Sequence, residues 1–138
     1  MQKAILCDID GTLSLRGDRG PYDWLKVGDD SMNEPIVKIL DLFRCPYSIY
    51  ETILISGRDE ICRKQTEYWL LLNGIHYKDL LMRSENDNRK DSIVKKELYE
   101  KHIKDKYEVL CVFDDRQQVV DMWRSLGLTC LQVAEGNF

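Results

Sequence analysis

The chain has 138 residues, of which 43% are hydrophobic and 32% are charged, and its formal net charge is −4. This length is typical of one domain, and this balance of apolar and charged residues excludes a disordered segment. The negative net charge excludes a protein that holds nucleic acid by its overall charge, so any such contact needs a local basic patch.

The five cysteines indicate a reducing compartment. Their number is odd, and no Cys-x-x-Cys pair occurs. Such usage fits a cytoplasmic protein better than a secreted disulfide framework. A strand predicted to begin near Met1 leaves no room for a signal peptide, and no apolar stretch reaches the roughly 20 residues that cross a bilayer. We therefore expect a cytoplasmic protein without a membrane partner.

The first predicted element is a buried strand at residues 3–7 that ends at a pair of acids. Asp8 and Asp10 lie one residue apart, and Gly11 follows them. An apolar run that stops at Gly indicates a strand followed by a turn, and open α/β sheets bind ligands at the carboxyl ends of their strands. Two close carboxylates repel each other unless a cation or a shared proton relieves them, and oxygen ligands favour Mg²⁺. The pair therefore predicts a magnesium site.

A long loop is predicted next, over residues 8–30, with a small flap at about 13–30. Loops of this length are usually functional or disordered. Tyr22 and Trp24 lie in the flap. Aromatic side chains there either stack on a nucleobase or pack the flap itself, and the sequence favours packing.

The chain continues with a helix and a second strand. Ser31 and Glu34 form a capping-box pattern ahead of apolar residues at helical spacing, so a helix is expected directly after Ser31. A strand is predicted over 48–55, and it ends before Ser56, Gly57 and Arg58.

The second half repeats the alternation of helix and strand. The predicted elements are a helix at about 59–73, a short strand at 80–82, a helix at 91–102, a strand at 109–113, a helix through about 124 and a strand at 128–133. This order predicts an α/β fold, a Rossmann-like parallel sheet with helices on both faces, in a single domain over 1–138. Asp8, Ser56 and Asp114 each follow a separate strand, so we expect them to meet at one edge of the sheet.

These residues together resemble the motifs of the haloacid-dehalogenase-like phosphohydrolases. The matching parts are Asp-x-Asp-Gly-Thr at 8–12, Ser56, Lys95 and the acidic pair at 114–115. The chain is also similar, nearly end to end, to the 3′-phosphatase domain of bacteriophage polynucleotide kinase/phosphatase. That likeness rests on Arg19-Gly20-Pro21-Tyr22-Asp23, Ser56-Gly57-Arg58, Arg89-Lys90-Asp91 and Asp114-Asp115-Arg116. A G-x-x-x-x-G-K-[ST] loop does not occur, so no kinase domain is expected within 1–138.

The resemblance implies a magnesium-dependent phosphatase that hydrolyses 3′-phosphate ends of DNA or RNA, with a minimal flap in place of a cap domain. It makes Asp8 the nucleophile that forms an aspartyl-phosphate. Asp10 becomes the general acid, a role that suits a raised pKa, and a close anion is expected to raise it. The implied Mg²⁺ ligands are the Asp8 carboxylate, the Asp10 backbone carbonyl and an acid from Asp114 and Asp115, with Asp115 favoured.

The other residues that the resemblance implies would hold the phosphate and the substrate. Ser56 and Lys95 complete the catalytic set, with Lys90 as the alternative to Lys95. Arg19 and Arg58 form the expected substrate clamp, because guanidinium groups pair well with phosphate oxygens. Asp91 is expected to cap the following helix and to fix a basic side chain. The full substrate-binding set is Thr12, Arg19, Gly57, Arg58, Arg83, Arg89 and Asp91.

Two other functions stay open at the level of sequence. A small-molecule or nucleotide phosphomonoesterase would use the same chemistry, and the negative net charge favours it. A non-catalytic binding module would keep the acidic pocket only as a scaffold, and the intact motif set argues against it. A site without a large cap is open, which favours a polymer end. A separate kinase or ligase is a candidate partner, and the family suggests a bacteriophage source.

Overall fold

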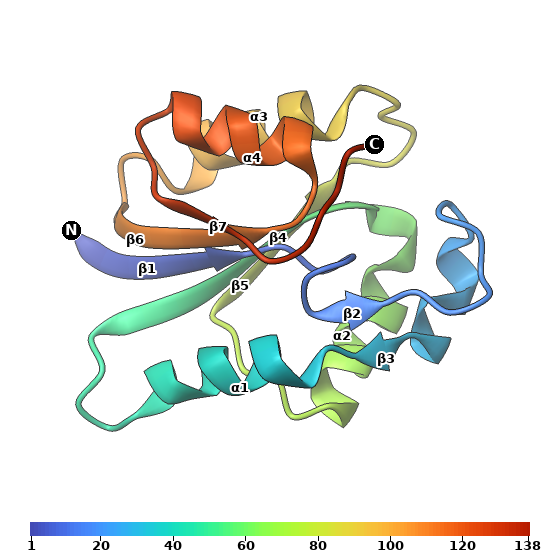
Figure 1. Ribbon diagram of the computed structural model, residues 1–138, viewed down its shortest axis with the longest axis horizontal. Coiled ribbons are helices and arrows are strands. Elements are labelled where there is room, and N and C mark those ends of the chain that lie inside the picture. The colour runs from blue at the N-terminus through green and yellow to red at the C-terminus, as the bar shows by residue number, and fades with distance from the viewer.

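The computed structural model describes all residues from Met1 to Phe138, and its centre is a five-stranded parallel sheet. The strand order is β5 (Asp79–Arg83), β4 (Tyr50–Asp59), β1 (Gln2–Cys7), β6 (Tyr107–Asp114) and β7 (Cys130–Gln132). Helices α3 (Asp91–His102) and α4 (Gln117–Ser125) cover one face, and α1 (Glu34–Asp41) and α2 (Arg63–Leu72) cover the other (Figure 1). The predicted α/β class is confirmed.

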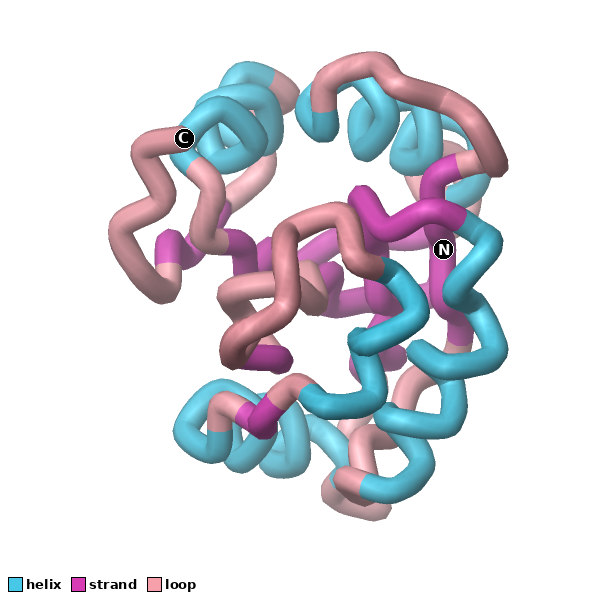
Figure 2. The backbone as a smooth tube through the Cα atoms, turned by 90° about the vertical axis from the view of Figure 1, so that its right-hand side faces the viewer, coloured by secondary structure: helices cyan, strands magenta, loops and turns pink.

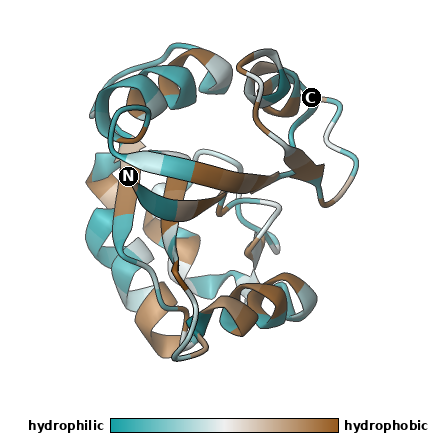
Figure 3. Cartoon of the chain, turned by 90° about the vertical axis from the view of Figure 1, so that its left-hand side faces the viewer, coloured by the Kyte–Doolittle hydropathy of each residue, from teal (hydrophilic) through white to brown (hydrophobic).

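The central strand β1 is apolar because both of its faces are covered. Its residues 4–7 are all fully buried. Ile5 packs in a core with Trp69 of α2, whereas Leu6 packs in a second core with Trp123 of α4. A strand buried on both faces has no reason to alternate polar and apolar residues, and apolar residues gather along the strands (Figure 3).

The helices are short, and two of them end at glycines. Gly74 follows α2 with a φ of 65°, and Gly127 follows α4 with a φ of 82°. Both stops agree with the sequence, since glycine adopts this left-handed conformation without strain. The short 3-10 turn η2 (Leu42–Arg44) follows α1, and a second one, η3 (Glu60–Cys62), precedes α2. None of the helices is both long enough and apolar enough to cross a membrane.

Two predicted boundaries are wrong. Strand β4 continues past 55 to Asp59, because Ser56 still pairs with β5 before the register shifts ahead of Asp59. Ser31 does not cap α1, because it lies in β3 (Ser31–Met32) and its hydroxyl donates to the Leu15 carbonyl at 3.3 Å. The helix begins instead after Asn33, which makes no side-chain cap.

The predicted flap is a small insertion between β1 and α1. It contains β2 (Ser14–Leu15), the 3-10 helix η1 (Trp24–Asp29) and β3, and β2 pairs antiparallel with β3. Val27 of η1 is fully buried, and the Trp69 indole donates to the Asp30 carbonyl at 2.8 Å. These contacts hold the flap in front of the carboxyl edge of the sheet (Figure 2).

Candidate active site

Acids from two neighbouring strands meet at the carboxyl edge of the sheet. Asp8 follows β1, Asp114 ends β6 and Asp115 comes next, and oxygens of the three carboxylates lie within 4.8 Å of one another. The Asp8 amide still donates to the Phe113 carbonyl at 2.9 Å, so the sheet itself sets this spacing. Gly11 then turns the chain with a φ of 81°, and a Cβ there would lie 2.1 Å from an Asp115 oxygen. The expected meeting of Asp8 and Asp114 at this edge is confirmed.

Lys95 supplies the positive charge of this cluster. It lies on α3 with its side chain 2% exposed, and its Nζ donates to Asp8 Oδ1 at 2.7 Å and to Asp114 Oδ2 at 2.9 Å. Burial by itself would lower the pKa of Lys95, but the charges of Asp114 and Asp8 raise it. Burial and the charge of Asp114 raise the pKa of Asp8 well above its usual range, and Lys95 opposes that shift. We call Asp8, Lys95, Asp114 and Asp115 the carboxylate cluster.

The two acids of β6 differ in how many protein donors they meet. Asp114 Oδ2 accepts from Lys95 and from the Trp123 indole at 3.2 Å, and Oδ1 accepts from the Asp115 amide at 2.9 Å. The Asp115 carboxylate accepts only from the Thr12 hydroxyl, at 3.4 Å. Asp115 therefore has more capacity left for a further ligand than Asp114.

The carboxylate cluster fits a divalent cation. Three carboxylates face one ammonium group, which leaves two negative charges in excess. Burial, followed by the charge of Asp114, raises the pKa of Asp115, as expected for crowded anions without enough counter-charge. All candidate ligand atoms are oxygens, which suits Mg²⁺.

A second charged group, which we call the arginine cluster, consists of Asp10, Asp30, Arg19 and Arg58. Arg58 donates to both Asp10 oxygens, from Nε at 3.0 Å and from an Nη at 2.8 Å. Arg19 donates to Asp10 at 2.9 Å and to both oxygens of Asp30 at 2.7 and 2.9 Å. An Nη of Arg58 also reaches Asp30 at 3.0 Å. This cluster joins the flap to the end of β4.

The arginine cluster contains both arginines of the expected substrate clamp. Arg58 is fully buried and Arg19 is 8% exposed, and both guanidinium groups point at carboxylates of the protein. The expected rise in the pKa of Asp10 is wrong: burial would raise this pKa, but the hydrogen bond and charge of Arg58 and the charge of Arg19 lower it. Sequence reasoning missed Asp30, because nothing in an Asp-rich loop distinguishes this acid from its neighbours.

The hydroxyl residues of the first two motifs, Thr12 and Ser56, form hydrogen bonds within the protein. The Thr12 hydroxyl donates to Asp8 Oδ2 at 3.1 Å. Ser56 is fully buried, and its Oγ accepts from the Arg58 amide at 3.1 Å. At Gly57 a Cβ would lie 2.3 Å from Asp91 Oδ1, so glycine leaves the room that the Asp91 carboxylate occupies.

Asp91 binds two arginines rather than capping α3. It is the first residue of the helix, and Lys90 precedes it at the capping position without a side-chain cap. Its carboxylate accepts from Arg83 and, at 2.8 Å, from Arg116. The cap prediction is wrong because these guanidinium groups compete for the carboxylate. Arg89 lies apart on the surface, in ion pairs with Asp87 and Glu97.

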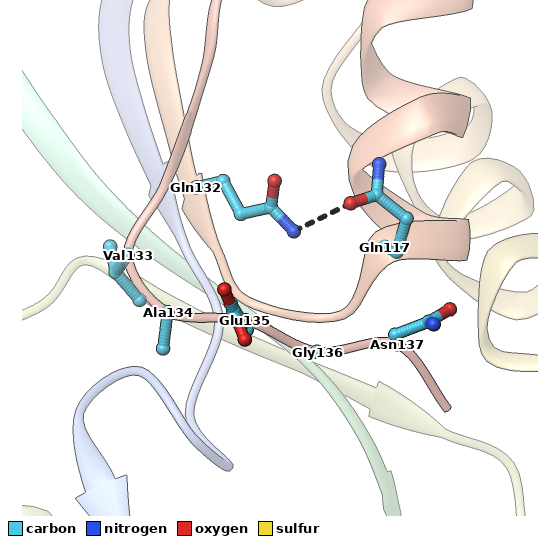
Figure 4. A pocket seen from close by; sticks show the side chains of 7 residues that line it. All are labelled: Gln117, Gln132, Val133, Ala134, Glu135, Gly136 and Asn137. Carbon is cyan, nitrogen blue, oxygen red and sulfur yellow. Dashed lines mark hydrogen bonds between the residues drawn. The ribbon is translucent and has the colours of Figure 1, made fainter.

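Sequence reasoning did not assign Arg116 to the site, although Arg116 connects it to the C-terminal tail. Its Nε donates to the Phe138 carbonyl at 2.9 Å, and its guanidinium lies 5.0 Å from the Phe138 ring centre. The Gln132 amide donates to the Asp115 carbonyl at 3.1 Å. It also donates to Gln117 at 2.9 Å (Figure 4). The C-terminal tail thus contacts the backbone of Asp115 and the side chain of Arg116. It also borders an open cavity of about 770 Å³, lined by Gln117, Gln132, Val133, Ala134, Glu135, Gly136 and Asn137.

The whole chain matches one protein family. Residues 2–138 match the family described as the polynucleotide kinase PNKP phosphatase domain. The chain is also similar to a putative bifunctional polynucleotide kinase/RNA ligase of Autographa californica nuclear polyhedrosis virus, with 37% identity over 130 residues. That match covers 91% of this chain and 18% of the viral protein.

Solved structures agree with this match. A chain in the structure of a Pnkp1/Rnl/Hen1 complex is 46% identical, with a TM-score of 0.96 over 100% of this chain and 48% of that chain. The HAD domain of the effector protein Lem4 from Legionella pneumophila is 13% identical, with a TM-score of 0.59 over 99% of this chain and 88% of that chain, a likeness of fold alone. This chain spans less than half the length of the viral protein and of the chain in that complex. It has the haloacid-dehalogenase fold and belongs to the family of polynucleotide kinase phosphatase domains.

Proposed function

We propose that this protein is a magnesium-dependent phosphatase that hydrolyses 3′-phosphate ends of DNA or RNA through an aspartyl-phosphate on Asp8. The observation that carries the proposal is the setting of the Asp8 carboxylate at the edge of the sheet. It is held by Lys95 at 2.7 Å and lies among carboxylates that leave two negative charges in excess. Membership of the polynucleotide kinase phosphatase family supports a nucleic-acid end as the substrate.

The reaction would proceed in two displacement steps. In the first, an Asp8 oxygen attacks phosphorus, the bond from phosphorus to the 3′ oxygen breaks, and the leaving oxygen takes a proton from Asp10. In the second, a water oxygen attacks the same phosphorus and gives its proton to Asp10. The bond from phosphorus to Asp8 breaks, which releases inorganic phosphate and restores both carboxyl groups.

The arginine cluster would orient Asp10 for these proton transfers. Arg19 and Arg58 hold its carboxylate from two sides, although the Asp10 side chain is still 38% exposed. Both arginines lower the pKa of Asp10, whereas the first step needs it protonated. A bound phosphate dianion would bring new negative charge beside Asp10 and raise its pKa, so that protonation accompanies substrate binding.

The carboxylate cluster would hold the metal ion and the phosphate. Asp8, Asp115 and the backbone carbonyl of Asp10 are the proposed Mg²⁺ ligands, with Asp114 fixing Lys95 and the Asp115 amide. Bound Mg²⁺ supplies positive charge that offsets the repulsion between the phosphate and Asp8. Lys95 would keep Asp8 oriented, and the hydroxyl of Ser56 would hydrogen-bond a phosphate oxygen.

The proposal extends to partners and setting. Chains similar to this one occur in a polynucleotide kinase/RNA ligase and in a complex of Pnkp1, Rnl and Hen1. We therefore propose that the protein acts alongside a kinase or an RNA ligase, in the reducing cytoplasmic compartment that the cysteine pattern predicts.

A substrate panel tests the proposed function. We would measure kcat/KM with Mg²⁺ on a 3′-phosphorylated oligonucleotide, the same oligonucleotide phosphorylated at its 5′ end, a 3′-mononucleotide and a sugar phosphate. The 3′-phosphorylated oligonucleotide should exceed both the 5′ isomer and the sugar phosphate by at least about tenfold, or about 1.4 kcal/mol of transition-state preference. A sugar phosphate that reacts about tenfold faster than the oligonucleotide would instead identify a small-molecule phosphatase.

A further inference from the structure

The flap carries an exposed aromatic side chain at the corner of a tight turn. The Asp23 amide donates to the Gly20 carbonyl at 3.1 Å, which places Pro21 and Tyr22 at the two corners. Proline suits the first corner of such a turn. Tyr22 is 78% exposed, and its hydroxyl has no hydrogen-bond partner in the protein. The turn therefore presents the ring to solvent.

Trp24 supports that ring from behind. Trp24 is half-buried and packs against the core that contains Val27. The Tyr22 and Trp24 rings stand edge to face, with their centres 6.0 Å apart and an interplanar angle of 82°. Such a pair is favourable and directional. The structure thus separates the two aromatics: Trp24 packs the flap, and Tyr22 keeps a free face.

The turn is anchored at the catalytic edge. Arg19 directly precedes it and donates to Asp10 at 2.9 Å and to the Gly20 carbonyl at 3.2 Å. The segment after β2 passes in front of the sheet edge before it enters η1 (Figure 2). Tyr22 therefore lies three residues from a side chain that touches the proposed general acid.

We propose that Tyr22 stacks on a nucleobase near the 3′ end of the strand whose terminal phosphate Asp8 attacks, an inference that rests on the proposed function. Base–aromatic stacking is tolerant of sequence because every base has a π face. It also needs no positive charge, which suits a chain with a net charge of −4. Tyr22 is then a specificity determinant that favours polynucleotide ends over small phosphate esters.

The test varies the base and the ring together. Substrates are a single-stranded 3′-phosphorylated oligothymidylate, the same oligomer with its last two nucleotides abasic, and p-nitrophenyl phosphate. Removal of one stacking ring lowers affinity by about 5- to 150-fold. Tyr22→Ala should lower kcat/KM on the full oligomer by at least about fivefold, mainly by raising KM. It should change kcat/KM on the abasic oligomer and on p-nitrophenyl phosphate by less than about twofold. Tyr22→Phe should retain the parent values.

Tyr47→Ala is the matched control, because Tyr47 is 91% exposed in the loop between η2 and β4. It should leave all three rates unchanged. The inference is overturned if Tyr22→Ala lowers kcat/KM on the full and the abasic oligomer by the same factor, or if it lowers kcat/KM on neither. Failure of the proposed function has a different signature: the parent protein would then hydrolyse p-nitrophenyl phosphate but neither oligomer.

Discussion

The carboxylate cluster and the arginine cluster lie at the same edge of the sheet, but they differ in their balance of charge. The first has three carboxylates and one ammonium group, and the pKa values of Asp8 and Asp115 are raised. The second has two carboxylates and two guanidinium groups, and the pKa of Asp10 is lowered. One cluster lacks positive charge, whereas the other is already neutral overall.

The difference indicates separate tasks for acids that lie only one residue apart along the chain. Asp8 lies in the cluster with excess negative charge, so its carboxylate is left to pair with a bound cation. Asp10 lies where arginines already satisfy it, so its position is set before any ligand arrives. A metal ion should therefore offset the excess negative charge of the first cluster. In the second cluster it should contact only the backbone carbonyl of Asp10 and leave the ion pairs of the side chains unchanged.

The largest expected effect is on turnover in Asp8→Asn. The amide cannot act as the nucleophile, so kcat should fall to about one thousandth or less of the parent value. Because the substitution removes one of three crowded acids, the thermal midpoint should hold or rise. Steady-state hydrolysis of a 3′-phosphorylated oligonucleotide and a melting curve check both parts. Turnover within tenfold of the parent would remove Asp8 from its role.

Lys95→Met tests the charge deficit of the carboxylate cluster. It leaves the buried carboxylates of Asp8 and Asp114 without their ammonium partner, so the free energy of unfolding should fall by about 3–5 kcal/mol in metal-free buffer. Saturating Mg²⁺ should recover part of that loss. Urea unfolding with and without Mg²⁺ measures it, and Lys96→Met, at the exposed neighbouring position, is the control. Equal losses in both variants would contradict the assignment.

Arg58→Lys tests the arginine cluster. Lysine keeps the charge but loses the two-pronged contact with Asp10 and the contact with Asp30, so the free energy of unfolding should fall by about 2–3 kcal/mol. The loss should be the same with and without Mg²⁺, unlike that of Lys95→Met. Arg89→Lys, in an exposed ion pair, should leave the unfolding midpoint unchanged. A loss that Mg²⁺ relieves would show that the clusters are not separate.

The smallest expected effect is on the pH dependence of metal binding. Asp8 and Asp115 have raised pKa values without metal, so their neutral forms gain population as pH falls, and a neutral carboxyl does not bind Mg²⁺. The Mg²⁺ midpoint should rise at least about tenfold from about pH 8 to about pH 5. Thermal shift against Mg²⁺ concentration checks it. A midpoint independent of pH would argue against carboxylate ligands with raised pKa values.

Local pattern was enough to predict much of the carboxylate cluster. A continuous apolar run predicted β1, and the acids after it were placed at the carboxyl edge because parallel strands share that edge. The same reasoning located Asp114 after β6. The strand order itself and the closeness of Lys95 to Asp8 needed the fold, since 87 residues separate that pair in the chain.

The local sequence pattern gave wrong element boundaries where a residue pairs with a strand that is distant in the sequence. Ser56 and Gly57 were predicted to follow the second strand, but pairing with β5 extends β4 beyond them. Ser31 lies in a capping-box pattern, but in the structure it pairs with Leu15 in the hairpin of β2 and β3. In both cases a non-local backbone partner outweighs the local preference.

By itself the sequence determined the fold class, the acids at the strand ends and the motif set of a phosphohydrolase, because these depend on periodicity and short spacing. Only the tertiary structure decided what the arginines contact. Arg19 and Arg58 bind Asp10 and also Asp30, which the sequence did not single out. A long cationic side chain pairs with whichever carboxylate the fold brings within reach, and that choice is made in space, not along the chain.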